Sequence, residues 1–555
     1  MSDERSPSPP EKKRHGVTDL DQIEAPVTWK AYLMCAFATF GGIFFGYDSG
    51  YINGVSGSKL FITAVEGAEG TALSSSHSSL IVSILSAGTF FGALMAGDLA
   101  DFFGRRTTII IGCFTYIAGC IVQTATTTND KTQALGLIVA GRLLAGFGVG
   151  HVSATIIMYM SEICPRKVRG ALVSGYQFCI TVGILLASCV VFATKDRPDS
   201  GQYRIPIAIQ FAWGLILGTG LFFLPESPRY YVKHGKFEEA RASLSSVRGQ
   251  PPDSHYIEYE LSEIIANAEL EKKLVYSRGY IGSWANCFSG SLWEAKSHLR
   301  RTILGTSLQM MQQWTGVNFI FYYSTPFLES TGAIKNTFLI SLIFTLINVC
   351  STPISFWTIE RFGRRPLLIW GALGMLTCQF ICAIIGVTVG FDHTHPLAGS
   401  DPVKDVANNI NAVNAQIAFI CIFIFFFAST WGPGAWVVIG EVFPLPMRSR
   451  GIGLSTASNW LWNTIIAVIT PYMVGVDKGN LKSKVFFVWG SLCTCAFVYS
   501  YFLVPETKGL TLEQVDLMFE ESTPRTSAKW RPTHTFAEMG AKDGHLVVQD
   551  GKEAV

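Results

Sequence analysis

The chain has 555 residues, of which 49% are hydrophobic and only 15% are charged, and its formal net charge is +2. This near-neutral balance, without basic runs interleaved with aromatic residues, argues against nucleic acid as a partner. The charges gather in short runs such as DFFGRR (101–106), and the apolar runs between them are about 18 to 25 residues long, the length that spans a bilayer. The sequence therefore predicts an all-α protein that crosses the lipid bilayer many times.

The chain begins with a hydrophilic stretch, residues 1–28, that is rich in Pro, Ser and charged residues. It lacks the apolar core of a signal peptide, so we predict a disordered cytosolic tail. Lys12, Lys13 and Arg14 precede the first apolar run, and further arginines abut helix ends on the same side of the membrane. Because cytosolic loops carry an excess of Lys and Arg, both termini are predicted to lie in the cytosol.

Twelve candidate spans follow, and their continuously apolar runs indicate helices rather than the alternating strands of a barrel. They lie near residues 30–51, 80–100, 107–127, 134–157, 171–194, 207–224, 301–323, 336–358, 367–390, 413–437, 451–474 and 484–504. Between the sixth and seventh spans, residues 225–300 are predicted to form a cytosolic linker with short helices. Within it, Ile257, Leu261 and Ile264 repeat at helical spacing, which predicts an amphipathic helix.

Three motifs occur twice, in the same order, in the two halves of the chain. DFFGRR (101–106) returns as ERFGRR (360–365), SEICPRKVRG (161–170) as GEVFPLPMRSRG (440–451), and PESPR (225–229) as PETKG (505–509). The repetition predicts two pseudo-symmetric six-helix bundles, residues 29–224 and 301–505, with a cytosolic helix and tail over 506–555. Internal repeats of this kind are typical of carriers that bind their substrate between two halves.

The sequence offers no constellation suited to catalysis or metal binding. Its thirteen cysteines sit mostly inside spans, without the spacing of a metal site or a disulfide framework, and we expect them to be small core residues. No nucleophile with a neighbouring base, and no pair of acids, falls at one predicted site. We therefore predict neither enzymatic activity nor a bound cofactor or metal.

Eight motifs together resemble the sugar porter family of the major facilitator superfamily, and fungal hexose transporters in particular. They are GDLADFFGRR, GRLLAGFGVG, SEICPRKVRG, PESPR, QQWTGVNFIFYYS, ERFGRR, GPGAWVVIGEVFP and PETKG, spread over about residues 30 to 520. The resemblance implies transport of a monosaccharide, glucose or another hexose, across the plasma membrane by alternating access, often together with a proton.

Several carboxamides occur within the predicted spans, notably in QMMQQWTGVNFIFYYSTP (309–326). Amide side chains donate and accept hydrogen bonds without a net charge, so they can replace the water that the hydroxyls of a sugar lose. Gln312, Gln313 and Asn318 do not share one helix face, so local unwinding at Gly316 is expected. The resemblance implies that the substrate contacts Gln177, Gln312, Gln313, Asn318, Asn348, Trp436, Asn459 and Asn463, with the Trp436 indole packed on the sugar ring.

Each of these amides has an alternative role, because a lone amide in a span also serves to join two helices by a hydrogen bond. The sequence departs from some facilitative glucose carriers of the family, which place a glutamate eight residues before the tryptophan. Ala428 stands at that position here, and Ser429 and Thr430 are the nearest polar groups. The resemblance therefore leaves open which hexose, or which pentose, is preferred.

Asp48 lies inside the first span, where an ionised carboxylate is costly unless it is paired. Arg142, in the fourth span, is its expected partner. By resemblance to proton-coupled sugar porters, Asp48 is the proton site and Arg142 its counter-charge, which predicts sugar:proton symport. The alternatives are a permanent ion pair in a facilitative carrier, and a non-transporting glucose sensor. Sensors of this fold typically have a long C-terminal extension, whereas only about fifty residues follow PETKG here.

Charged residues repeat at the cytosolic ends of both halves, and the resemblance implies that they form a gate on that side. They are Asp101, Arg105, Arg106, Glu162, Arg169 and Glu226 in the first half, and Glu360, Arg364, Arg365, Glu441, Arg448 and Glu506 in the second. For the arginines, anchoring by the positive-inside rule is a compatible second role. Tyr322 and Tyr323 are predicted to form an extracellular lid, or else part of an aromatic belt at the membrane surface.

Overall fold

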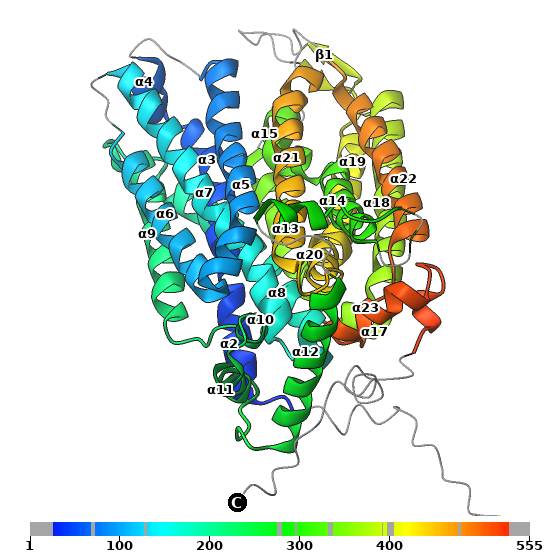
Figure 1. Ribbon diagram of the computed structural model, residues 1–555. Coiled ribbons are helices and arrows are strands. Elements are labelled where there is room, and N and C mark those ends of the chain that lie inside the picture. The colour runs from blue at the N-terminus through cyan, green and yellow to red at the C-terminus, as the bar shows by residue number, and fades with distance from the viewer. Residues whose placement is uncertain are drawn as a thin grey trace, which may run out of the picture.

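The computed structural model describes residues 26–67, 73–126, 130–274, 280–292, 294, 297–330, 337–390, 392–396, 405–474 and 479–531. Most of the predicted N-terminal tail, and the C-terminal tail after residue 531, lie outside these residues. Two bundles of helices stand side by side, the first coloured blue to teal and the second green to orange (Figure 1). Strands β1 (Thr394–Pro396) and β2 (Asp405–Ala407) pair antiparallel in the connection between the ninth and tenth predicted spans.

The first bundle is built from helices that follow the first six predicted spans. They are α2 (Trp29–Thr39), α3 (Gly41–Ser56), α5 (Ser75–Phe103), α6 (Arg105–Thr124), α7 (Lys131–Ile163), α8 (Arg169–Thr194) and α9 (Gly201–Leu221), with the short α4 (Lys59–Glu66) between α3 and α5. Thr28 caps α2, because its hydroxyl oxygen accepts from the Ala31 N–H at 3.3 Å.

The second bundle repeats this order. It contains α14 (His298–Trp314), α15 (Val317–Ser330), α16 (Thr337–Ser351), α17 (Ile354–Phe362), α18 (Arg364–Thr388), α19 (Ile410–Phe426), α20 (Gly432–Glu441), α21 (Arg448–Val474) and α22 (Val485–Leu503). Between α19 and α20 the tenth span has a π-helical turn, η3 (Phe427–Trp431). Turns of this kind often mark functional sites in helices.

By length and composition, eight of the described helical segments can each cross a membrane, and the pair α16 and α17, bent by 43°, makes nine. The three remaining predicted spans have identifiable reasons for missing this criterion. Phe40 separates α2 from α3, Thr315 and Gly316 separate α14 from α15, and α21 is long enough but polar. With these three included, the described helices match the twelve predicted spans.

Gly316 confirms the unwinding expected in the seventh span. Its φ of +82° lies in the left-handed region, and a Cβ at this position would come within 2.6 Å of the Trp489 ring. Glycine therefore satisfies both the backbone and the packing at this point. The break lets α14 and α15 take different directions, so side chains before and after it can face the same space.

The short helices gather at one end of the bundles, the lower end in Figure 1, which we call the charged end. They are α10 (Pro228–Lys233), α11 (Phe237–Arg248), α12 (His255–Leu274) and α23 (Leu512–Glu521). The predicted amphipathic helix is confirmed as α12, since Ile257, Leu261 and Ile264 are buried against α10, α11 and Leu445. Helix α13 (Tyr280–Asn286) lies higher, near α21 (Figure 1). We call the opposite end, which carries α4 and β1, the far end.

The two bundles meet along a seam formed by α5 with α21, and by α8 with α16, α17 and α20. At the charged end this seam is tight, because Gly97 lies directly against the backbone of α21. A Cβ on Gly97 would come within 2.8 Å of the Ser449 carbonyl oxygen. The bundles are therefore in backbone contact at this end.

Candidate functional site

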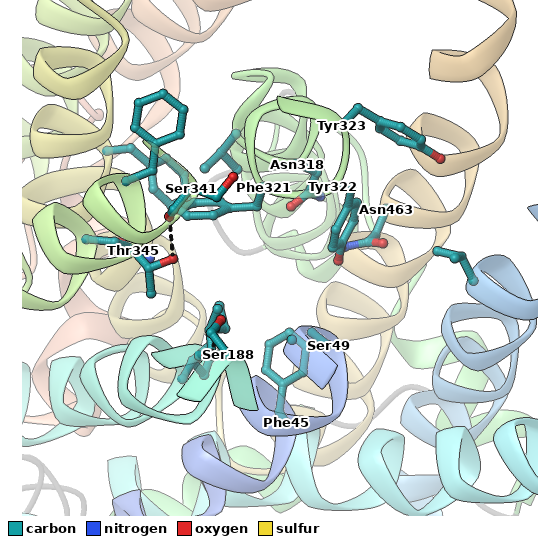
Figure 2. Close-up of a pocket in the computed structure, with 18 of the residues that line it drawn as sticks. Phe45, Ser49, Ser188, Asn318, Phe321, Tyr322, Tyr323, Ser341, Thr345 and Asn463 are labelled. Atoms are coloured by element: carbon teal, nitrogen blue, oxygen red, sulfur yellow. Dashed lines mark hydrogen bonds between the residues drawn. The ribbon is translucent and has the colours of Figure 1, made fainter. Parts of the chain in front are cut away.

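A cavity of about 470 Å³ lies between the two bundles. All eight residues predicted to bind substrate line it: Gln177, Gln312, Gln313, Asn318, Asn348, Trp436, Asn459 and Asn463. The lining reaches Ser56 at the end of α3 and Ser78 in the first turn of α5, both at the far end. Figure 2 shows Phe45, Ser49 and Ser188 of the first bundle on one side of the space, with side chains of the second bundle on the other.

Gln312 is the most extensively bonded of these amides. Its Nε2 donates to the carbonyl oxygens of Trp431 and Gly432 at 3.0 and 2.9 Å, next to the π-helical turn. Its Oε1 accepts from Asn459 Nδ2 at 2.8 Å, and the same Nδ2 donates to Gln309 Oε1 at 2.7 Å. Gln312 and Asn459 therefore join α14, α20 and α21 while they line the cavity, so the structural and the ligand-facing roles coexist.

The other amides keep more hydrogen-bonding capacity. Asn318 Nδ2 donates to Gln313 Oε1 across the Gly316 break. Asn348 Oδ1 is buried without a hydrogen-bond partner among the described residues. A buried acceptor without a partner costs about 1 to 3 kcal/mol, so this oxygen is suited to accept from a ligand hydroxyl.

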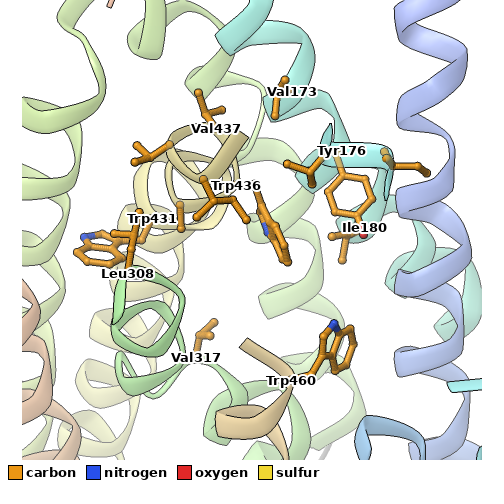
Figure 3. Close-up of a cluster of buried hydrophobic side chains, with 14 of the residues drawn as sticks. Val173, Tyr176, Ile180, Leu308, Val317, Trp431, Trp436, Val437 and Trp460 are labelled. Carbon is orange, nitrogen blue, oxygen red and sulfur yellow. The ribbon is translucent and has the colours of Figure 1, made fainter. Parts of the chain in front are cut away.

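Trp436 forms an aromatic floor where the two bundles meet. Its indole Nε1 donates to Gln177 Oε1 of α8 at 3.2 Å. Its ring meets that of Tyr176 edge to face, with the ring centroids 5.7 Å apart (Figure 3). These contacts fix the indole across the seam, in an orientation that offers the cavity an apolar surface with a polar rim.

The two tyrosines predicted as a lid both line the cavity, from α15. The Tyr322 hydroxyl accepts from Asn463 Nδ2 at 3.4 Å. The Tyr323 hydroxyl donates to the Ala467 carbonyl of α21 at 2.7 Å. The seventh and eleventh spans are thus joined on this side of the cavity.

A cluster of charges lies at the charged end of the first bundle. Arg105 forms two hydrogen bonds of 3.1 Å with the Glu162 carboxylate, and both side chains are fully buried. Glu226 accepts from the backbone N–H groups of Arg105 and Arg106 at 2.9 and 3.0 Å. Gly104 makes room for this carboxylate: its φ is +94°, and a Cβ would come within 2.4 Å of Glu226 Oε2.

The second bundle contains the matching cluster. Arg364 bonds Glu441 at 2.9 and 3.2 Å. Glu506 accepts from the backbone N–H groups of Arg364 and Arg365 at 3.0 and 3.1 Å. Gly363 has a φ of +98°, and a Cβ there would come within 2.3 Å of Glu506 Oε2. The repeated motifs therefore encode the same local structure twice.

The remaining two predicted gate arginines do not pair with the glutamates nearest to them in the sequence. Arg448 Nε donates to the Phe443 carbonyl at 2.9 Å, and Arg169 Nη1 donates to the Leu510 carbonyl at 3.4 Å. Both are buried, with 1% and 4% exposure. Both arginines donate to backbone carbonyls at the charged end, whereas the two main ion pairs are formed by Arg105 and Arg364.

Several links cross the seam at this end. Arg450 of α21 forms ion pairs with Asp98 and Asp101 of α5 at 2.8 and 3.1 Å. Glu360 Oε1 accepts from the Ala171 N–H of α8 at 3.1 Å. These contacts close the charged end, whereas the cavity extends toward the far end.

A further pair joins the linker to the C-terminal helix. Arg229 of α10 meets Glu513 of α23 at 2.8 Å. Burial opposes ionisation of the Glu513 carboxyl, but the guanidinium groups of Arg229 and Arg448 outweigh it and lower the pKa of this group to about 2. Arg229 also donates to the Glu162 carbonyl at 2.8 Å, so this pair is attached to the first cluster.

Comparison with known proteins decides the family. A family profile described as "Sugar (and other) transporter" matches residues 34–519. The chain is a sugar porter of the major facilitator superfamily. It is therefore a membrane transporter and not an enzyme, as the sequence predicted.

Relatives of this porter match over most of its length. The major facilitator-type transporter ecdD of Aspergillus rugulosus is 44% identical, over 93% of this chain and 92% of its own. The low-affinity glucose transporter HXT1 of Saccharomyces cerevisiae is 37% identical, over 90% and 84%. The fold matches the proton:xylose symporter XylE with 6-bromo-6-deoxy-D-glucose bound, at a TM-score of 0.74 and 24% identity, covering 88% of this chain and 99% of XylE. The predicted fold and family are thereby confirmed.

The porter differs from the sequence-based prediction at Asp48. This residue is fully buried, and neither carboxylate oxygen has a hydrogen-bond partner among the described residues. Arg142 instead donates to the Ile81 carbonyl at 2.7 Å and to the Tyr51 hydroxyl at 2.8 Å. The expected ion pair between Asp48 and Arg142 is therefore wrong for this conformation, because Tyr51, less than one helical turn further along α3, takes the guanidinium.

Sequence reasoning missed the hydroxyl residues of the porter's cavity. Ser341 and Thr345 of α16 line it together with Asn348, at helical spacing that puts the three on one face. The dashed line in Figure 2 marks the bond from Thr345 Oγ1 to the Ser341 carbonyl, 3.0 Å long. The helical spacing of Ser341 and Thr345 from Asn348 was the sequence signal that could have identified them. Ser429 and Thr430 are not part of the lining, and their hydroxyls bond to carbonyls of the preceding turn.

Proposed function

We propose that this porter carries a monosaccharide, a hexose such as glucose, across the plasma membrane by alternating access, with both termini in the cytosol. The observation that supports this most strongly is the cavity between the bundles, lined by carboxamides from both and floored by Trp436. Uncharged amides match a ring of hydroxyls, and an indole matches the apolar face of a pyranose. The relatives named above are consistent with this cargo, since HXT1 is a glucose transporter.

In this proposal the substrate contacts are Gln177, Gln312, Gln313, Asn318, Asn348, Trp436, Asn459 and Asn463. The clusters and cross-seam links at the charged end act as the cytosolic gate, and Tyr322 and Tyr323 act at the far end. The described conformation then faces outward. Breaking the cross-seam links while α15 closes over the sugar would convert it to the inward-facing form.

We further propose that transport is coupled to a proton carried by Asp48. A buried carboxyl without a partner favours its neutral, protonated form, and a rotation that brings Arg142 to it would favour release of the proton. The protonated state therefore belongs to the conformation described here. XylE, which has the same fold, is a proton:xylose symporter.

Uptake into proteoliposomes tests the whole proposal. The purified porter is reconstituted and offered labelled glucose, mannose, galactose and xylose, with and without an inward pH gradient. Saturable hexose uptake that a pH gradient drives above equilibrium is expected. Uptake that only equilibrates would indicate a facilitative carrier, and no uptake of any sugar, despite sugar binding, would indicate a sensor.

Asp48→Asn separates the proton proposal from the sugar proposal. The amide is close to isosteric with a protonated carboxyl, so sugar exchange should remain within about threefold of the unmodified porter while accumulation above equilibrium is lost. Accumulation that survives in this variant would exclude Asp48 as the proton site and leave the sugar assignment intact.

A further inference from the structure

A lipid-facing stripe of α5 contains one carboxylate, Asp98. Phe91, Met95, Asp98 and Phe102 follow one another at helical spacing, and the three apolar side chains are 52%, 49% and 75% exposed. In a membrane-spanning helix, exposed apolar side chains of this kind face lipid. A carboxylate on the same stripe is costly unless other residues cover and pair it.

Helix α13 provides that cover. The Tyr280 hydroxyl and the Trp284 indole N–H both donate to Asp98 Oδ2, at 2.9 and 3.2 Å. Arg450 of α21 pairs with the other carboxylate oxygen, and its guanidinium carbon lies 5.7 Å from the centroid of the Trp284 ring. Helix α13 therefore contacts both bundles where α5 and α21 meet.

The outer surface of this segment is apolar and uncovered. Ile281, Phe288 and Leu292 are 82%, 54% and 50% exposed. Ile281 and Ala285 lie on one face of α13, and Phe288 lies in the turn that follows this helix. Because the segment sits on the lipid-facing stripe of α5, the lipid that surrounds Phe91 and Met95 also reaches this face. In the sequence, Lys272, Lys273 and Arg278 precede it, as is typical of segments that lie on an anionic membrane surface.

We propose that residues 280–292 form a membrane-surface strap. Its apolar side chains insert among lipids at the boundary of the leaflet next to the charged end, and its polar side chains hold α5 to α21. Trp284 contacts Asp98 of α5 and Arg450 of α21 at the same time, so the strap stabilises the conformation in which the two bundles touch at this end. Lipid binding and gating are thereby linked, whatever sugar the porter carries.

Photocrosslinking tests the lipid contact. Benzoylphenylalanine replaces Ile281 in the full chain, in nanodiscs that contain anionic lipid, and adducts are identified by mass spectrometry. Glu258 of α12, which is also exposed but distant from the spans, is the matched control position. Lipid adducts at position 281 and none at 258 are expected. Adducts to protein, to solvent only, or to lipid at both positions would overturn the assignment.

Hydrogen–deuterium exchange tests the hold on the seam. The double variant Tyr280→Phe with Trp284→Phe removes both donors to Asp98 but keeps an aromatic ring at each position. We expect amide exchange at residues 97–103 and 448–453 to become about threefold faster or more, because opening of the charged end becomes more frequent. Trp370→Phe, at an exposed tryptophan of α18, is the control and should not change exchange there. Unchanged amide exchange in the double variant would show that residues 280–292 do not stabilise closure of the charged end.

Discussion

The charge clusters of the two bundles agree in their inner contacts and differ in their outer ones. Within each bundle, an arginine that follows a left-handed glycine pairs with one glutamate, while a second glutamate binds the backbone beside it. Across the seam, Asp101 of the first cluster meets the side chain of Arg450, and it also pairs with Lys233 of the linker helix α10. Among the described residues, Glu360 of the second cluster reaches across the seam to the Ala171 N–H. The duplicated motifs therefore hold each bundle together in the same way, whereas the contacts that they make across the seam differ between the two clusters.

The largest effect is expected from removing the central glutamate of either cluster. Glu162→Gln or Glu441→Gln leaves a buried arginine without its main counter-charge, at a cost of about 3 to 5 kcal/mol in stability. Glu162→Gln should cost more, because the remaining carboxylate is 3.7 Å from Arg105 in the first cluster and 3.3 Å from Arg364 in the second. Thermal unfolding in detergent measures both. A greater loss of stability for Glu441→Gln than for Glu162→Gln would contradict this ranking.

Alanine at the two glycines tests how well the clusters match. Gly104→Ala and Gly363→Ala each combine a left-handed backbone with a Cβ that collides with a glutamate, and about 1 to 3 kcal/mol should be lost in each case. Gly136→Ala is the control, because a Cβ there meets nothing within 4 Å. The melting temperature of Gly136→Ala should be unchanged, and those of the other two variants should be lowered by similar amounts. Two very different losses would show that the clusters are not equivalent.

A smaller effect is expected at the seam, and there the two clusters should differ. Arg450→Gln removes two ion pairs between the bundles and should shift the equilibrium toward opening of the charged end by about 1 to 2 kcal/mol. Glu360→Gln keeps an acceptor for Ala171 and should shift it less. Arg197→Gln, in an exposed pair, is the control and should change nothing measurable. Exchange rates at residues 97–103 report the shift, and equal shifts for Arg450→Gln and Glu360→Gln would contradict the comparison.

The Arg229–Glu513 pair is expected to contribute to stability in a way that depends on pH. The pKa of Glu513 is lowered to about 2, so the pair stabilises the folded state above the ordinary pKa of glutamate, about 4.3, and loses this contribution as the pH falls toward 2. The difference in melting temperature between the unmodified porter and Glu513→Gln should thus be constant from about pH 7 to 5 and narrow below about pH 4. If the difference in melting temperature already narrows near pH 6, the lowered pKa of Glu513 is excluded.

The fold and the candidate cavity were accessible from the sequence for physical reasons. Apolar length fixed the spans, and the repeated motifs predicted two equivalent bundles. Amides such as Gln312 and Asn348 stood out because an unneeded polar group in a span is costly. The unwinding at Gly316 was predicted because the amides on either side of it do not share one helix face. In each case a local property of the residues carried the information.

The cross-seam contacts were not accessible in the same way, because they depend on how each helix is rotated in the bundle. Asp48 and Arg142 are the obvious opposite charges, yet the Tyr51 hydroxyl holds the guanidinium. Thr345 is one of many span hydroxyls that bond their own helix, and only its register with Asn348 distinguishes it. The contacts of Asp98 could not be predicted, because they depend on where α13 and α21 lie relative to α5.

The polar character of α14 and α21 also has a consequence for how the chain is made. A helix that carries several Gln or Asn residues partitions poorly into hydrocarbon when it leaves the translocon alone. Amides of the two helices bond one another, since Asn459 Nδ2 donates to the Oε1 atoms of Gln309 and Gln312. We therefore expect the seventh span to be stabilised in the membrane once the eleventh is in place. The residues that suit the cavity to a hydrated cargo also make biosynthesis of the second bundle a cooperative event late in translation.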